Sequence, residues 1–168
     1  MLGGKTISYI IIDGYNLIGI YHKDLKKQRE QLIDSLIEYR KRKGHQVTVV
    51  FDGWKTGGGK ESQSVISGIK VIYSRIGDKA DSVIKRIIST ERREWIVVTS
   101  DRDIADYAWA TGSVPLSSED FLNLFVRKGS FDLEREEYDE EYKEPRRRGN
   151  PRRLSRKERA ILRALNKI

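Results

Sequence analysis

Apolar and polar residues follow two distinct periods along the chain. Short, almost entirely apolar runs rich in β-branched residues, such as those at 7–12 and 47–51, are typical of strands buried on both faces. Between these runs, apolar residues recur at three- and four-residue spacing among charges, which indicates amphipathic helices. The pattern predicts strands at 7–12, 47–51, 69–74 and 95–100, a short strand around Val114, and helices at 23–43, 79–93, 102–111 and 119–128.

Strands that alternate with helices define an α/β fold. Because the predicted strands are apolar throughout, we expect a parallel sheet covered by helices on both faces. The glycine-rich segment 54–64 is predicted to be a loop. Its GGGK stretch is similar to a phosphate-binding loop, but Glu61 stands where that loop needs Ser or Thr. We therefore interpret the segment as a mobile connection in which Lys55 and Lys60 can contact phosphates.

Charge and composition divide the chain into three parts. Residues 1–130 form the predicted domain, 131–144 are acidic, and 145–168 form an Arg-rich tail. The formal net charge of the chain is +8, and the tail holds ten Lys and Arg against one acidic residue. A tail of this kind serves as an arm for nucleic acid, or it is neutralised by the acidic segment before it.

The tail itself has two predicted parts. Pro and Gly interrupt its first half, which favours an extended linker. Ser155 and Glu158 then have the spacing of a capping box, and the apolar residues after them predict a short amphipathic helix. The basic residues of the linker are candidate RNA contacts: Arg146, Arg147, Arg148, Arg152 and Arg153.

Composition narrows the chemistry. The chain has no cysteine and only two histidines, so thiol catalysis, Cys-ligated metal sites and a Ser-His-Asp triad are excluded or poorly supplied. No Gly-rich dinucleotide motif follows the first strand, so we expect no organic cofactor. The chain has neither an apolar run long enough to span a membrane nor a signal-peptide cleavage pattern, so a cytoplasmic protein is expected. Catalysis would then rest on carboxylates.

Aspartates follow the ends of three predicted strands. Asp13, Asp52 and Asp101 occupy these positions, Asp103 comes two residues after the last of them, and Asp81 begins a helix on the same side. Ligands of an open α/β sheet gather outside the carboxyl ends of its strands. Carboxylates that lie close together repel unless a cation neutralises them, and hard divalent ions prefer oxygen ligands. The sequence therefore predicts a Mg²⁺ or Mn²⁺ site suited to hydrolysis of a phosphodiester by water.

Each of these residues also has a purely structural interpretation. An aspartate after a strand often forms a turn, which fits Asp52 best, or caps a helix, which fits Asp78 best. Asp101 and Asp103 compete as caps of the helix that follows them. Asn16 either holds a metal-bound water or the Asp13 carboxylate, or it caps a helix.

Four ordered motifs give the chain a resemblance to a known family. IIDGYNLIG at 11–19, VVFDG at 49–53, GDKADSVIKRI at 77–87 and VVTSDRDIADYA at 97–108 resemble the YacP-like branch of the NYN domains, within the PIN-like nuclease superfamily. The resemblance covers about residues 7–128 and implies a PIN-like three-layer α/β/α fold around a central parallel sheet. The Arg-rich extension after it is not part of the pattern, so its role is inferred from charge alone.

The resemblance also implies a metal-dependent ribonuclease and assigns its site. Asp13 would be the first metal ligand with Asn16 beside it, Asp81 the acid on a helix, Asp101 the acid after the fourth strand, and Asp103 a fourth candidate. The implied setting is bacterial, with RNA handled during translation and the ribosome as a candidate partner.

Three functions stay open at this point. The leading hypothesis is a Mg²⁺- or Mn²⁺-dependent endoribonuclease that uses these acids. The second is a non-catalytic RNA- or ribosome-binding module that depends on the basic tail. The third, a DNA flap or repair nuclease, would use the same acids on another substrate.

Overall fold

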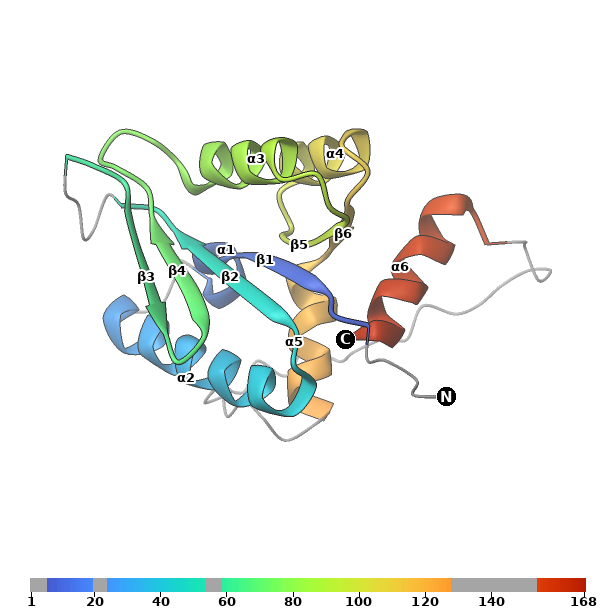
Figure 1. Ribbon diagram of the computed structural model, residues 1–168, viewed down its shortest axis with the longest axis horizontal. Helices are drawn as coiled ribbons and strands as arrows, with labels where there is room; N and C mark the ends of the chain where they lie inside the picture. Colours follow the sequence, from blue (N-terminus) through green and yellow to red (C-terminus); the bar gives the residue numbers. More distant parts are fainter. Residues whose placement is uncertain (1–5, 20–23, 54–58, 128–153) are drawn as a thin grey trace, which may run out of the picture.

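The chain folds around one six-stranded sheet (Figure 1). The computed structural model describes residues 6–19, 24–53, 59–127 and 154–168. The strand order is β3-β4-β2-β1-β5-β6, so the first strand is central and pairs in parallel with β2 and β5. The strands are β1 (Tyr9–Asp13), β2 (Gln46–Phe51), β3 (Ser62–Ile66), β4 (Ile69–Tyr73), β5 (Trp95–Val98) and β6 (Val114–Leu116).

Helices cover both faces of the sheet, as the sequence predicted. Alternate residues of the central strand enter two separate cores, so that Ile10 and Ile12 pack on one side and Ile11 on the other. On the first side lie α1 (Gly14–Ile18), α2 (Leu25–Lys43), α5 (Ser118–Arg127) and α6 (Arg156–Lys167); on the second lie α3 (Ala80–Thr90) and α4 (Arg102–Ala110). The predicted three-layer α/β/α arrangement is confirmed. Among the described helices none is long and apolar enough to cross a membrane.

The sheet is parallel except at one edge, where a strand lies that the sequence did not predict. Residues 62–66, predicted as part of a loop, form β3, which pairs antiparallel with β4. Every residue of β3 is exposed, so the strand has no buried apolar stripe to reveal it in the sequence. Ser67 and Gly68 both have positive φ, 47° and 87°, which makes the two-residue hairpin turn that joins these strands.

A second difference lies directly after β1. The sequence predicted a turn at Asp13-Gly14, whereas the chain enters the five-residue helix α1 there. This entry requires a glycine, because a Cβ on Gly14 would lie 2.3 Å from the ring of Phe51. The Phe51 ring in turn lies 5.1 Å from the ring of Tyr15, centroid to centroid. The start of α1 is therefore packed tightly against the end of β2.

Helix α6 packs against the domain through its last turn. The predicted capping box is present, with Ser155 and Glu158 bonded reciprocally at its start. Ala164 and Ile168 are buried in the core shared with α2 and α5. The Ser8 backbone N–H donates to His45 Nδ1 (3.1 Å), so the neutral ring carries its proton on Nε2, which donates to the Lys167 carbonyl (3.0 Å). His45 thus joins α6 to the starts of β1 and β2.

We expect His45→Ala to lower the free energy of unfolding by about 2 to 4 kcal/mol, because it leaves a buried N–H and a carbonyl without partners. Urea unfolding followed by circular dichroism measures the effect. Gln46→Ala, at the exposed neighbouring position, is the control and should change stability by less than about 0.5 kcal/mol. A His45→Ala variant as stable as this control would contradict the role given to His45.

Candidate active site at the carboxyl edge of the sheet

Five aspartates lie along the carboxyl ends of the parallel strands. Asp13 ends β1, Asp52 follows β2, and Asp101 immediately precedes α4. Asp81 and Asp103 occupy the first turns of α3 and α4. Because β1 pairs in parallel with both β2 and β5, their ends meet at one edge. We call this group, Asp13, Asp52, Asp81, Asp101 and Asp103, the acid edge.

Asp13 is the most perturbed member of the acid edge. Burial of its carboxyl raises the pKa from 3.8 to about 7, the charge of Asp52 adds to this effect, and the charge of Asp101 adds less. The Asn16 backbone amide and the Thr99 hydroxyl favour the charged form and offset part of the shift; Thr99 Oγ1 lies 3.5 Å from Asp13 Oδ2. A carboxyl that exchanges its proton near neutral pH is typical of a functional site.

Asp52 and Asp101 each hold the start of a helix. The Ala80 backbone N–H donates to Asp52 Oδ1 (2.6 Å), so Asp52 caps α3 from a distant part of the chain. Asp101 Oδ1 accepts from the backbone N–H groups of Asp103 (2.8 Å) and Ile104 (3.4 Å). These bonds use one carboxylate oxygen of each residue.

Two structural interpretations of the sequence are thereby decided. The cap predicted for Asp78 is wrong: its carboxylate instead pairs with Arg75 Nε (2.6 Å), and Asp52 serves the helix. Of the two competing candidates at the start of α4, Asp101 is the cap. The Asp103 carboxylate does not cap α4 and can therefore bind another partner.

Asn16 connects three elements behind the acid edge. Its side-chain carbonyl accepts from the Ser100 backbone N–H (2.8 Å) and from Ser118 Oγ (2.6 Å). It lies inside α1 and does not cap it, contrary to the structural alternative. Asn16 thus fixes α1 to the segment after β5 and to the start of α5, and only its amide nitrogen is left to meet a ligand.

Lys85 is a cation inside the acid edge that sequence reasoning missed. Its Nζ pairs with Asp103 Oδ2 (2.5 Å) between α3 and α4. This hydrogen bond raises the Lys85 pKa above its usual value, and the charges of Asp103, Asp81 and Asp101 act in the same direction. The only signal in the sequence is that Lys85 follows Asp81 by one helical turn. Its partner comes from another helix and could not be found locally.

The donor set of the acid edge suits a hard divalent ion, since every member offers carboxylate oxygens. The pKa of Asp13 is raised first by burial and then by the charges of Asp52 and Asp101, and a bound cation would favour the charged form against all three. Within the described residues, however, no three acidic or histidine side chains lie close enough together to hold one ion. The residues fit the ion in their chemistry, and the carboxylates would have to close around it.

Basic residues flank the acid edge. Lys79 and Arg102 stand at the starts of α3 and α4 and are exposed; the sequence reasoning did not single them out. Lys60, which it did, is exposed just before β3. The other predicted RNA contacts lie outside the described residues: Lys55, Arg146, Arg147, Arg148, Arg152 and Arg153.

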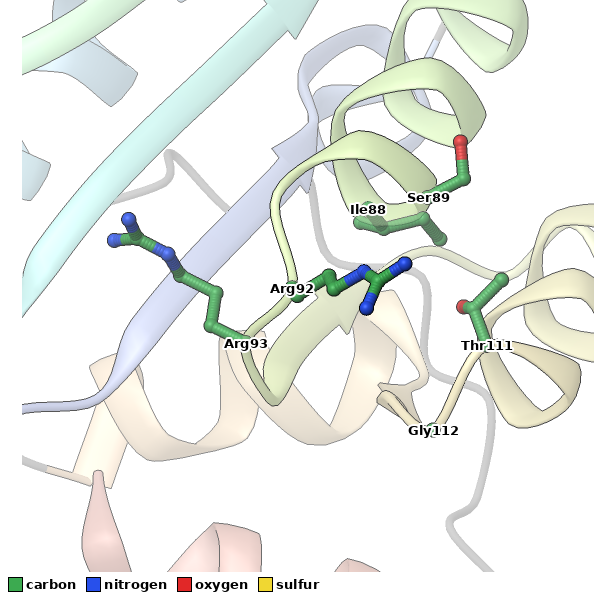
Figure 2. A pocket seen from close by; sticks show the side chains of 6 residues that line it. All are labelled: Ile88, Ser89, Arg92, Arg93, Thr111 and Gly112. Carbon is green, nitrogen blue, oxygen red and sulfur yellow. The ribbon is translucent and has the colours of Figure 1, made fainter.

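Two hollows of the described surface lie away from the acid edge. One, of about 430 Å³, is at the ends of α3 and α4, where Arg92 points toward Thr111 and Arg93 points away (Figure 2). The other, of about 520 Å³, lies near the starts of β1 and β5 and is lined by Arg40, Lys70 and Arg93 among others. Neither contains a member of the acid edge.

We expect Asp13→Asn to stabilise the protein above neutral pH. An unfolded Asp13 loses its proton near pH 4 and the folded one near pH 7, so ionisation weakens the folded state as pH rises between these values. The amide removes a penalty on the order of 2 to 4 kcal/mol at pH 8 and almost none at pH 4. Thermal unfolding at both pH values measures it, with Asp34→Asn on the exposed face of α2 as control. Equal melting temperatures for Asp13→Asn and wild type at pH 8 would contradict the burial of this charge.

Comparison with known proteins identifies a family that the sequence of this chain matches. The profile of the YacP-like NYN domain matches residues 10–167, so it extends past the 7–128 of the motif resemblance and through α6. YacP of Bacillus subtilis (strain 168), described as uncharacterized, is 33% identical over an alignment of 85 residues, and the match covers 46% of this chain and 49% of that protein. The chain thus spans about half the length of this curated relative.

Solved structures agree on the fold. A crystal structure of Rae1 (YacP) from Bacillus subtilis is 27% identical with a TM-score of 0.57, covering 72% of this chain and 75% of that one. A variant of the same protein gives a TM-score of 0.58 at 22% identity, covering 71% and 75%. The fold is the nuclease-like α/β fold of these proteins. With residues 10–167 matched by the family profile, this chain belongs to the YacP-like NYN domain family.

Proposed function

We propose that this protein is a Mg²⁺- or Mn²⁺-dependent endoribonuclease that hydrolyses RNA at the acid edge. The observation that supports it best is Asp13 at the end of the central strand, where burial of the carboxyl, and to a smaller extent the charges of Asp52 and Asp101, raise its pKa to about 7. The Asn16 backbone amide and the Thr99 hydroxyl bond to this carboxyl, but they do not offset the cost of its burial, and its pKa stays well above the usual value. A charge kept at that energetic disadvantage needs a functional reason.

Asp13, Asp81, Asp101 and Asp103 would hold the ion, and Asn16 would keep α1 in place beside it. The chemistry that such an ion supplies when bound is deprotonation of a water and neutralisation of the leaving oxygen. Asp101 Oδ1 accepts from the Asp103 backbone N–H, and Asp81 Oδ1 accepts from the Ser82 backbone N–H. The Oδ2 atom of each residue would then bind the ion. Lys79, Arg102 and Lys60 would hold the phosphates of the RNA on either side.

Lys85 would change its partner when an ion binds. In the described state it neutralises Asp103. An ion bound among the same carboxylates would repel the ammonium and release Asp103 as a ligand. Lys85 would then be left at the edge of the site, where it can contact a substrate phosphate. RNA handled on the ribosome fits the proposal, with the ribosome as the setting in which the substrate is presented.

One observation favours the second candidate, a non-catalytic RNA- or ribosome-binding module. Lys85 already neutralises Asp103, and no three described carboxylates are assembled for an ion. If the acid edge has only a structural role, RNA binding would persist when its aspartates are replaced, and no divalent ion would support cleavage.

Cleavage of labelled single-stranded RNA with Mn²⁺ decides between the two candidates. We expect Asp13→Asn and Asp81→Asn to reduce the rate by at least about a hundredfold, the size expected when charge stabilisation at the reacting phosphate is lost. Asp34→Asn should cleave like wild type. Because Asp13→Asn is expected to be at least as stable as wild type, its loss of activity would not reflect unfolding.

The same assay includes two further substrates. DNA of matched sequence should resist cleavage, and its cleavage at the rate of RNA would favour the DNA nuclease. RNA bound to translating ribosomes should be cleaved if naked RNA is not. Equal cleavage by wild type and Asp13→Asn on every substrate would contradict the proposed site.

A further inference from the structure

Helix α6 presents a continuous row of basic side chains to solvent. Arg156, Arg159, Arg163 and Lys167 follow one another at three- and four-residue spacing, so they lie on one face of the helix. All four are exposed. In the part of the chain that the structure describes, none of the four takes part in an ion pair. We call these four residues the α6 stripe; it extends over about 16 Å at 1.5 Å per residue.

The apolar side of α6 is already occupied. Ala164 and Ile168 are 3% and 2% exposed, and Ile161 and Leu165 pack partly buried against the same core. At the other end of the helix, Lys157 Nζ lies 5.4 Å from the centre of the Trp109 ring on α4. The helix therefore contacts the domain near both ends, and the α6 stripe lies on its solvent-facing side.

The α6 stripe lies away from the acid edge. The end of α6 bonds to His45, which precedes β2 and accepts from Ser8 before β1, so it meets the amino ends of the strands. Trp109 belongs to the last turn of α4, which also points to that end. β1 alone separates its two ends by about 16 Å, from five residues at about 3.3 Å each. Figure 1 shows α6 on the side of the molecule opposite β3 and β4.

We propose that the α6 stripe binds the phosphate backbone of RNA at a distance from the linkage that is cut. This inference rests on the proposed function for the identity of the nucleic acid. Guanidinium groups at one-turn spacing can each pair with a phosphate, and the planar fork of arginine matches phosphate oxygens. An RNA strand held at the α6 stripe must extend at least the length of β1, about 16 Å, before it reaches Asp13, so the protein selects long or structured RNA.

Other polyanions fit the α6 stripe less well. A membrane surface would require the apolar face of the helix, which is buried against the domain. An acidic protein partner would require a cluster of exposed apolar residues at the centre of its contact, whereas α6 exposes one large apolar side chain, Leu162, beside the stripe. A repeating phosphate chain is the partner that needs nothing else from this surface.

The test measures binding and cleavage separately. Binding of a 30-nucleotide RNA without metal is followed by fluorescence anisotropy from 50 to 200 mM KCl, in the full chain. The test variant combines Arg156→Gln, Arg159→Gln and Arg163→Gln, and its thermal unfolding should match wild type because all three side chains are exposed. The matched control combines Lys26→Gln, Lys27→Gln and Lys41→Gln on exposed positions of α2, which removes the same charge elsewhere.

We expect the stripe variant to bind roughly tenfold more weakly at low salt and to lose about 2 from the slope of log affinity against log salt, about 0.7 for each lost phosphate contact. The control should stay within about twofold of wild type. An unchanged slope in the stripe variant, or an equal loss in the control, would overturn the proposal.

A dinucleotide, whose single phosphate cannot lie at the α6 stripe and beside Asp13 at the same time, separates this inference from the proposed function. Wild type and the stripe variant should cleave it equally, while the stripe variant should cleave the long RNA more slowly. If neither protein cleaves any RNA, the proposed function fails and the anisotropy result still decides the α6 stripe. If the cleavage rate of the stripe variant falls more on the short RNA than on the long one, the α6 stripe does not bind RNA at a distance from the cleaved linkage.

Discussion

The buried carboxyl of Asp13 is the constraint on which the site depends. It ends the central strand of the sheet, where strands on both sides and α1 after it leave the residue only partly accessible to water. A carboxylate in such a place is costly unless its charge is compensated. The structure supplies only partial compensation, from the Asn16 backbone amide and the Thr99 hydroxyl, and adds two negative neighbours. The remaining demand for positive charge defines what this edge can bind.

The surrounding acids combine support with reactivity. Asp52 and Asp101 hold the starts of α3 and α4 with one oxygen each, and helix starts are favourable places for negative charge. The helices therefore stabilise the same carboxylates that repel Asp13. Lys85 of α3 pairs with Asp103 of α4, and this ion pair reduces the repulsion among the acids that lie farther from Asp13. The inner part of the acid edge thus stays short of positive charge while the outer part is neutralised.

The same residues show how far sequence reasoning could go. Strands and helices with one buried stripe were predicted to within a few residues, since burial imposes their periods. β3 escaped because no face of it is buried, and its only local signal was the Ser67-Gly68 pair. The placement of Asp13, Asp81, Asp101 and Asp103 at one edge followed from the rule for parallel sheets. Their partners did not, because Lys85 meets Asp103 across 18 residues and Asp52 reaches Ala80 across 28.

The C-terminal tail was also predicted only in part from the sequence. The capping box predicted where α6 begins, but the position of α6 depends on a contact with His45 across more than a hundred residues and on a cation–π contact of Lys157 with Trp109 of α4. The assignment of residues 131–144 and of the linker before α6 stays a prediction, since residues 128–153 lie outside the described part of the chain. Charge in this protein is therefore distributed by position: a deficit of positive charge at the carboxyl edge, and a surplus on a helix docked at the amino edge.

The central claim is that the acid edge takes up a divalent cation because Asp13 is buried among like charges. Calorimetric titration of Mn²⁺ into the metal-free protein tests it without reference to cleavage. The account predicts saturable binding to wild type and to Asp34→Asn, and an affinity lower by roughly tenfold or more in Asp13→Asn, as expected when a carboxylate of a metal site is replaced. Identical binding by Asp13→Asn and wild type, or no binding by either, would contradict it.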